Sequence, residues 1–240
     1  RLIGAETGAN LRQMPARYLL LDEVDEYKPA VDDQGDPIDL AIKRTATFGT
    51  RRKVYAVSTP TAEGRSTIWR LFEEGDQRRY HVPCPFCGHA QALEFSRLTW
   101  EKDRPETVVY RCIACGEGIE ERHKGAMLEA GRWVASNPLP TDTVRSYHLS
   151  SLYSPNGWYT WVQLVKDWLA AQGNPTKLKT FTNHVLAETW KEAGESPPWE
   201  RLYNRRAPYE QGTVPLGALV LTAGADVQKD RIECEVVDPR

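Results

Sequence analysis

The sequence predicts a mixed α/β protein with a four-cysteine metal-binding module in its middle. Three observations support this prediction: an apolar strand that ends in two carboxylates, a second apolar strand that follows one helical segment later, and two cysteine pairs with C-x-x-C spacing. The chain has 240 residues, of which 40% are apolar. That length and composition suit one large soluble domain or about two to three small ones.

Charge and hydropathy restrict the classes of protein that the chain can belong to. The formal net charge is −2, so the whole chain is not a strongly basic nucleic-acid binder. No apolar run approaches the roughly 20 residues that a membrane-spanning helix needs, and no signal peptide opens the chain. Local basic groups could still contact phosphates, although solvated surface charge explains each more simply: Arg51-Arg52-Lys53, Arg78-Arg79, and Arg201 with Arg205-Arg206.

The first strand is predicted at residues 18–21, directly before Asp22 and Glu23. Its three consecutive leucines are typical of a strand buried on both faces, as in a parallel sheet. Ligands bind outside the carboxyl ends of such strands. The acidic pair suits a nucleoside triphosphatase, in which Asp22 helps to hold the Mg²⁺ on the phosphates and Glu23 orients or deprotonates the attacking water. A strand that merely ends in a polar turn remains the alternative.

A second strand is predicted at residues 53–57, and Ser58, Thr59 and Pro60 follow it. The two hydroxyl groups could sense the γ-phosphate of a nucleotide and pass its presence on to a bound polymer. The alternative is an ordinary exit from a strand into a loop that caps the next helix.

The two strands flank a predicted helix at residues 36–48. Asp36 fits the N-cap, Pro37 the first helical position and Gly49 the C-terminal stop. Strand, helix and strand then form a βαβ unit.

Two C-x-x-C pairs, separated by residues 88–111, predict a tetrahedral zinc site formed by Cys84, Cys87, Cys112 and Cys115. A glycine after each pair supplies the left-handed backbone conformation that such a turn needs. Residues 91–95 and 107–111 alternate like short strands, so we interpret residues 80–122 as a zinc ribbon. Two disulfides would require an oxidising compartment, which the missing secretion signal argues against. The ribbon could have a purely structural role, or it could contact DNA or a partner subunit.

Most of the tryptophans lie in residues 157–199. Thr160 can cap a helix whose apolar positions follow helical spacing: 161, 164, 165, 168 and 169. A second helix is predicted at residues 176–190, with residues 178, 181 and 185 inward. Aromatic stripes at this spacing usually belong to a core. Residues 194–215, rich in Pro and Arg, are expected to be a linker.

The end of the chain is predicted to be a hairpin. Residues 218–225 form a strand that ends at Asp226, and a turn near Lys229-Asp230 leads into residues 231–237. Asp226 could be the first ligand of a two-metal nuclease, in which paired cations stabilise the attacking and leaving oxygens. Aspartate is also common near turns, so a structural role is the alternative.

The order of these motifs resembles the large subunit of lambda-like tailed-phage terminases over almost the whole chain: Arg17 to Asp25 (RYLLLDEVD), Ser58-Thr59-Pro60-Thr61, the two cysteine pairs, and Gly224-Ala225-Asp226-Val227-Gln228. The resemblance implies a RecA-like P-loop packaging ATPase followed by an RNase H-like nuclease. Such a protein cuts concatemeric viral DNA and drives it into an empty procapsid.

The resemblance also implies roles for single residues. Asp22 resembles the Walker B magnesium ligand, and Glu23 resembles the catalytic carboxylate. Residues 58–60 resemble the motif that couples hydrolysis to DNA movement. Asp226 resembles the first Mg²⁺ or Mn²⁺ ligand of the nuclease. No Gly-rich phosphate loop with a lysine precedes Asp22, so we expect an internal fragment that is inactive by itself; a prophage remnant stays open.

We therefore expect five segments: the C-terminal half of the ATPase domain (1–79), the zinc ribbon (80–122), a helical region (123–193), a linker (194–215) and the start of the nuclease (216–240). The implied cofactors are ATP with Mg²⁺, Zn²⁺, and Mg²⁺ or Mn²⁺ for cleavage. The implied partners are double-stranded DNA, the terminase small subunit, the portal and procapsid, and further copies of the chain, all in the host bacterial cytoplasm with no membrane.

Two other functions fit some of the motifs. Asp22-Glu23 followed by Ser58-Thr59-Pro60 also resembles helicase motifs II and III, so a DNA helicase or translocase with an inserted zinc ribbon is the alternative enzyme. A helicase would continue into a second RecA-like domain in place of a hairpin with Asp226. A non-catalytic zinc-ribbon DNA-binding or scaffold protein is the alternative outside enzymes.

Overall fold

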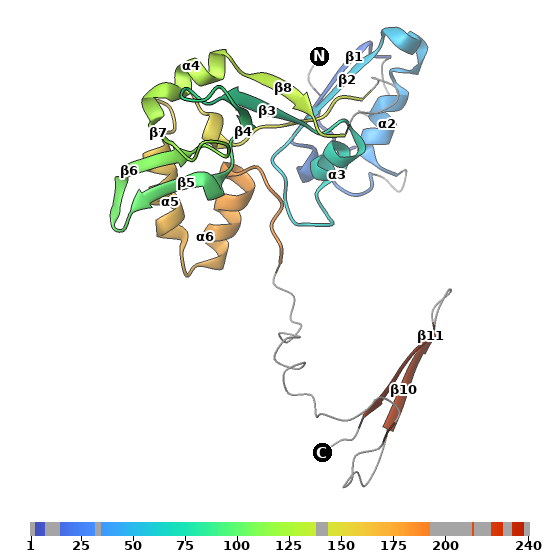
Figure 1. Cartoon of the computed structure of the whole chain (residues 1–240). Helices are drawn as coiled ribbons and strands as arrows, with labels where there is room; N and C mark the ends of the chain where they lie inside the picture. Colours follow the sequence, from blue (N-terminus) through green and yellow to red (C-terminus); the bar gives the residue numbers. More distant parts are fainter. Residues whose placement is uncertain are drawn as a thin grey trace. The chain divides into compact units, whose positions relative to one another are not determined.

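The computed structural model describes residues 3–7, 15–31, 35–137, 144–192 and 213, together with the backbone of residues 222–227 and 232–237. The chain forms two compact units, Arg1–Glu192 and Ala193–Arg240 (Figure 1). Among the described residues, no helix has the length and apolar character to cross a bilayer.

The predicted βαβ unit is present in the first unit. Strands β1 (Tyr18–Asp22) and β2 (Lys53–Val57) pair in parallel, with Leu21 opposite Ala56. The short 3-10 helix η1 (Val24–Glu26) follows β1. The carboxyl ends of both strands consequently lie at one edge of the sheet, as the sequence predicts.

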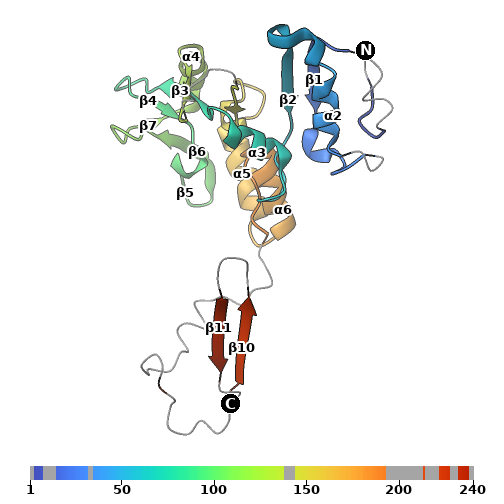
Figure 2. The same ribbon diagram turned by 90° about the vertical axis from the view of Figure 1, so that its right-hand side faces the viewer.

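The prediction that the first strand is buried on both faces is wrong for the described part of the chain. Leu21 is 5% exposed, but Leu20 is 77% exposed. The helix α2 (Pro37–Lys43) lies against the face that carries Leu21 (Figure 2), where Ile38 and Ala41 join the same buried cluster. The opposite face, which carries Leu20, is not covered by described residues.

Helix α2 begins as predicted and ends earlier. The Asp36 carboxylate accepts a hydrogen bond from the Ile38 amide at 2.7 Å, and Pro37 is the first helical residue. The helix ends at Lys43 because the buried Thr45 hydroxyl bonds back to the Ile42 carbonyl at 2.7 Å.

A 3-10 segment, η2 (Ala46–Arg51), takes the place of the predicted last helical turn. Gly49 lies inside it with φ of 52°, so this glycine bends the 3-10 segment and does not end the α-helix. Helix α3 (Thr67–Glu74) follows β2 and is capped by the Ser66 hydroxyl, which accepts from the Trp69 amide at 3.2 Å.

The four-cysteine region is built on two small sheets (Figure 1). In the first sheet, β3 (Arg78–Pro83) pairs with each of the three other strands. These are β4 (Ala90–Ala92), β8 (Arg132–Ala135) and β9 (Tyr147–His148). The second is a meander of β5 (Leu98–Glu101), β6 (Arg104–Arg111) and β7 (Gly118–Ile119).

One of the two strands predicted in this region is correct. Residues 107–111 lie in β6, but the strand predicted at 91–95 ends at Ala92. The next two amides donate to side chains instead of a neighbouring strand: Leu93 to the Tyr153 hydroxyl at 2.6 Å and Glu94 to the Tyr110 hydroxyl at 3.2 Å. The 3-10 helix η3 (Phe95–Arg97) then begins.

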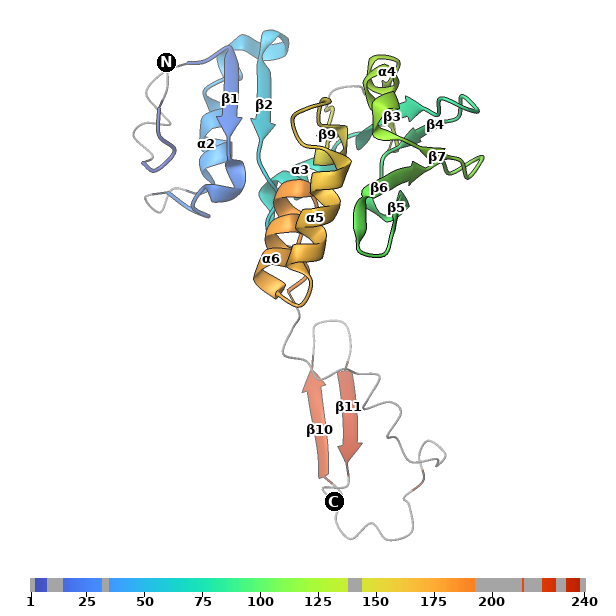
Figure 3. The ribbon, with the colours of Figure 1, turned by 90° about the vertical axis from the view of Figure 1, so that its left-hand side faces the viewer.

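The later helices of the first unit are, in chain order, η4 (Glu121–His123), α4 (Lys124–Glu129), η5 (Ser151–Tyr153), α5 (Trp161–Ala171), α6 (Pro175–Thr180) and the π-helical turn η6 (Phe181–Val185). Helix α4 contacts β3, and α5 contacts β6. Figure 3 shows α5 and α6 side by side.

Helix α5 confirms the first helix predicted in the Trp-rich region. The Thr160 hydroxyl accepts from the Gln163 amide at 3.1 Å, and Trp161, Leu164 and Val165 are fully buried. Leu169, the last of the predicted apolar positions, is 39% exposed.

The second predicted helix is shorter than expected. Helix α6 with η6 ends at Val185, and Ala187 has φ of 56°, which stops the helix well before residue 190. Phe181 is buried as predicted.

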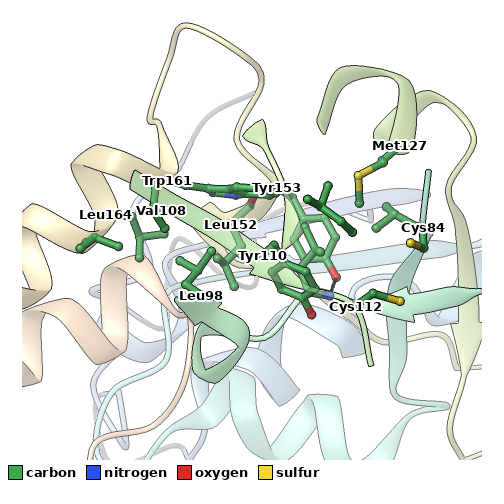
Figure 4. Close-up of a cluster of buried hydrophobic side chains, with 14 of the residues drawn as sticks. Cys84, Leu98, Val108, Tyr110, Cys112, Met127, Leu152, Tyr153, Trp161 and Leu164 are labelled. Carbon is green, nitrogen blue, oxygen red and sulfur yellow. Dashed lines mark hydrogen bonds between the residues drawn. The ribbon is translucent and has the colours of Figure 1, made fainter. Parts of the chain in front are cut away.

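One apolar core joins the cysteine region to the helices (Figure 4). Trp161 is fully buried, and its indole N–H donates to the Leu152 carbonyl at 3.0 Å. Cys84 and Cys112 belong to the same buried cluster as Trp161 and Tyr110. The cysteine region and α5 therefore depend on one another for burial.

The described part of the second unit is an antiparallel hairpin of β10 (Thr222–Val227) and β11 (Ile232–Val237). The predicted hairpin is thus confirmed. Asp226 lies within β10, opposite Glu233, and the strand continues to Val227 instead of ending before Asp226. The expected strand residues 218–221, the turn at 229–230 and the linker at 194–215, apart from Thr213, lie outside the described residues.

A buried ion pair links η4 to α5. The Lys124 side chain is 0% exposed, and its Nζ lies 2.5 Å from Glu121 Oε1 and 5.4 Å from the centre of the Trp161 ring. The Glu121 carboxylate also accepts from the Trp161 amide at 3.0 Å, so it satisfies both the buried cation and the start of α5.

We predict that Glu121→Ala destabilises the protein by about 3–5 kcal/mol, because it leaves the Lys124 charge buried without a partner. Glu120→Ala is the matched control: Glu120 pairs with Arg122 at 3.1 Å on the surface, so its loss should cost less than about 1 kcal/mol. Urea unfolding of the two variants measures the difference. Equal midpoints would show that the buried pair contributes no more than the exposed one.

Candidate functional site

The carboxyl edge of the β1–β2 sheet brings together residues from two strands. The Ser58 hydroxyl, directly after β2, donates to Glu23 Oε2, directly after β1, at 3.3 Å. The same hydroxyl accepts from the Asp25 amide at 3.2 Å. Asp22 is exposed at the end of β1. The edge therefore presents two carboxylates and a hydroxyl to solvent, which is a ligand set suited to a hydrated divalent cation.

The backbone at Glu23 is held in an uncommon conformation. Its φ and ψ are 52° and 51°, in the left-handed region, which costs a residue other than glycine on the order of 1 kcal/mol or more. Such strain persists only where neighbouring contacts fix it, and it is concentrated at functional sites. Here the buried Val24 and the bond to Ser58 hold the turn that carries the Glu23 carboxylate.

Asp25 organises the site, and sequence reasoning assigned it no role. Its Oδ2 accepts from the Thr61 hydroxyl at 2.8 Å, and its Oδ1 accepts from the Ile68 amide at the start of α3 at 2.6 Å. One carboxylate thus joins the turn after β1, the loop after β2 and the next helix. The sequence signal was its position two residues after Glu23 in the same acidic run.

Asn183 is a second residue that the sequence did not reveal. It is 5% exposed, and its Nδ2 donates to the carbonyls of Pro60 at 2.6 Å and Thr61 at 2.7 Å. The residue lies in a segment predicted as ordinary helix, more than a hundred residues from the loop that it contacts. No local pattern could have identified it.

The four cysteines predicted as metal ligands come together. All four sulfur atoms lie within 4.8 Å of one another; Cys84 and Cys115 are 3.9 Å apart, and Cys87 and Cys112 are 3.7 Å apart. These distances exceed a disulfide bond of about 2.05 Å. A tetrahedral zinc ion with bonds of about 2.3 Å would place its sulfur ligands about 3.8 Å apart, so the cluster fits that ion.

The two cysteine turns have the same geometry. The Gly88 amide donates to the Cys84 carbonyl at 2.9 Å, and the Gly116 amide donates to the Cys112 carbonyl at 3.1 Å. These glycines have φ of 73° and 74°, which confirms the predicted left-handed conformation. The side-chain oxygen of the buried Gln91 also accepts from the Ile113 amide at 2.8 Å and so braces the second turn.

The ionisation of the thiols favours a cation at the cluster. Burial raises the pKa of Cys112, but hydrogen bonds from the backbone at Cys115 and Ala114 and from neighbouring thiols lower it to about 6. A backbone hydrogen bond at Glu117 lowers the pKa of Cys115, but burial and the three other thiols raise it to about 12. The Cys112 thiol therefore ionises readily, whereas ionisation of a second thiol beside it is opposed by the first negative charge. A divalent cation would relieve this repulsion.

Asp226, the predicted nuclease ligand, lies in β10 of the second unit, and the hairpin register places it opposite Glu233.

The predicted coupling residues Thr59 and Pro60 follow Ser58 in the loop after β2, and Pro60 is buried.

Two protein-family models match the chain. Residues 1–133 match the family model of the phage terminase large subunit gpA, ATPase domain. The chain belongs to the phage terminase large-subunit family. Residues 144–238 match the gpA endonuclease domain. The combination favours a terminase over the helicase alternative, since an endonuclease match follows the ATPase match.

Two curated relatives carry the same description. The chain is 33% identical to the terminase large subunit of Enterobacteria phage P21 over 260 aligned residues, which cover 98% of this chain and 39% of the relative. It is 32% identical to that of Escherichia phage lambda over 258 residues, which cover 98% and 40%. The chain therefore spans about two fifths of the length of these relatives. No solved structure matches it.

The terminase family models and the compact units divide the chain at different places. The ATPase match includes the four-cysteine region, and the endonuclease match begins at residue 144. Residues 144–192 nevertheless fold within the first unit, beside the ATPase-matched residues. The five segments expected from the sequence remain predictions.

Proposed function

We propose that the intact protein containing this chain is a viral DNA-packaging motor and endonuclease. It hydrolyses ATP to move double-stranded DNA into a procapsid, and it cleaves concatemeric DNA with a metal-dependent nuclease. The observation that carries this proposal is the 3.3 Å approach of Ser58 to Glu23 at the shared edge of β1 and β2, in a chain matched by an ATPase family and then by an endonuclease family.

Each residue at the edge has a distinct proposed role in a RecA-like ATPase domain. Asp22 would hold the Mg²⁺ of the bound nucleotide, which supplies charge neutralisation on the phosphates. Glu23 orients the attacking water and accepts its proton. Ser58, in bonding distance of Glu23, reports through Thr59 and Pro60 whether the γ-phosphate is present. Asp226 would hold Mg²⁺ or Mn²⁺ in an RNase H-like nuclease domain.

Cys84, Cys87, Cys112 and Cys115 would hold one Zn²⁺ and so form a zinc ribbon. The sulfur distances and the glycine-ended turns support this assignment. Because Cys84 and Cys112 belong to the core that contains Trp161, the ribbon's proposed role is structural.

The proposed partners follow from the motor function. They are double-stranded DNA, the terminase small subunit, the portal and procapsid, and further copies of the chain in a packaging oligomer. The proposed location is the host bacterial cytoplasm.

The zinc assignment predicts about one zinc per chain in the purified protein. Cys87→Ser should lose most of that metal, because serine does not supply a thiolate. Metal analysis by mass spectrometry under native conditions gives the stoichiometry. Protein refolded with zinc that still carries none, or a native mass with two disulfides, would contradict the assignment.

For the motor, Glu23→Gln in the intact protein should lower ATP turnover by about a hundredfold or more while nucleotide binding persists. The amide has nearly the same shape but accepts no proton, and Asp22 is unchanged. Glu26→Gln is the matched control, because Glu26 is exposed in the adjacent turn. Steady-state hydrolysis and nucleotide titration separate the two effects. Near-normal turnover in Glu23→Gln would remove the catalytic role.

For the nuclease, Asp226→Asn in the intact protein should eliminate Mg²⁺- or Mn²⁺-dependent DNA cleavage, because the amide is a poor metal ligand. ATP turnover should stay within about twofold, because Asp226 lies in the second unit and the carboxylates proposed to act on ATP lie in the first. Glu235→Gln, in the neighbouring strand, is the control. Normal cleavage by a variant with an unchanged melting curve would leave Asp226 with only a structural role.

A further inference from the structure

The loop that follows β2, residues 58–63, is held by a segment from the endonuclease-matched part of the chain, residues 183–190. The Asn183 side-chain nitrogen lies 2.6 and 2.7 Å from two successive carbonyls of this loop, those of Pro60 and Thr61, and 3.3 Å from the Glu188 carbonyl. The amide is buried, so a displaced loop would leave unpaired polar groups away from water. The loop and Asn183 are therefore expected to move together.

Trp190 provides a second attachment to the same loop. Its backbone N–H donates to the Thr61 carbonyl at 2.9 Å, and its carbonyl accepts from the Glu63 amide at 2.9 Å. Together these bonds form a parallel bridge between Trp190 and Ala62. The Thr61 carbonyl thus receives hydrogen bonds from both Asn183 and Trp190.

The segment between these two attachments is itself fixed. It begins in the π-helical turn η6, and such turns are often found at functional sites. Ala187 has a left-handed backbone, and its carbonyl lies 3.0 Å from Nε2 of the half-buried His148. The Glu188 amide donates back to Thr182 at 3.1 Å. A displacement of the loop would consequently move residues 183–190 as one unit, because their own hydrogen bonds hold them together.

On its other side the loop is bonded to the acidic residues after β1. The Thr61 hydroxyl donates to Asp25, and the Ser58 hydroxyl donates to Glu23. Hydrogen bonds on its two sides, together with the backbone of the loop itself, therefore connect Glu23 to Asn183 and Trp190, and the chain enters the second unit at Ala193.

We propose that Asn183 and Trp190 are positioning residues that transmit the nucleotide state of the Glu23–Ser58 edge to the chain entering the second unit. This inference rests on the proposed ATPase function and adds a route by which nucleotide binding reaches the nuclease side. Energetic coupling between the two ends of this route is measured as the response of one end to nucleotide bound at the other, so the test follows that response and not stability.

The experiment follows hydrogen exchange of the intact protein with and without a saturating non-hydrolysable ATP analogue and Mg²⁺. The analogue should slow exchange in the peptide that spans residues 183–192 by about fivefold or more. Asn183→Ala should reduce that slowing to about twofold or less. His184→Ala, an exposed neighbour in the same π-helical turn, is the control and should keep the full response.

Thr61→Val is the second variant, and it removes the hydroxyl bond to Asp25 with little change in volume. It should also reduce the response, and it decides the question if Asn183→Ala does not fold. The double variant should lose no more than the single variants if both act on one route. A wild-type protein that binds the analogue without a change at 183–192, or folded variants that respond normally, would overturn the proposal. A wild-type protein that neither binds nor hydrolyses ATP would instead refute the proposed function.

Discussion

The in-register parallel pairing of β1 with β2 is the constraint on which the candidate site depends. Because Asp22 lies opposite Val57, the next residues, Glu23 and Ser58, emerge at the same level of the sheet and can bond to each other. Each residue adds about 3.3 Å along a strand, and a slip of one residue also reverses the face of every side chain. Such a slip would separate the carboxylate from the hydroxyl and expose Leu21, whose burial against α2 opposes it.

Buried polar groups set the rest of the architecture, and each of those discussed has specific partners. Lys124 is paired with Glu121, and the Asn183 amide with two loop carbonyls. A polar group in a core is costly unless its partners are correctly placed. Alternative packings of α5 or η6 would leave these groups unsatisfied. An apolar core alone would tolerate several arrangements of the helices, and the polar contacts favour one of them.

The sequence was informative where structure is decided locally. Asp36 and Pro37 identified the start of α2, Thr160 the start of α5, and the glycines after the cysteine pairs the conformation of both turns. These are contacts within a few residues. The order of motifs was also sufficient to anticipate the terminase family.

The sequence was less informative where contacts between residues far apart in the chain determine the structure. The end of β4 depends on the hydroxyls of Tyr110 and Tyr153, which come from later segments of the chain. Helical periodicity continued past residue 185, but the contacts of Ala187 and Trp190 take the backbone out of the helix. The role of Asn183 in the candidate site depends on a partner more than a hundred positions away, which no local pattern contains.

The burial of Trp161 has a consequence for how terminase genes can exchange parts. A crossover between two related genes keeps a hybrid folded when it separates segments that have separate cores. A junction between the two family matches, near residue 140, would divide a core in which Trp161 on one side packs with Tyr110 on the other. A junction after Glu192 leaves that core intact. Successful exchange of nuclease segments between related phages should therefore favour the second position, although sequence families draw their border at the first.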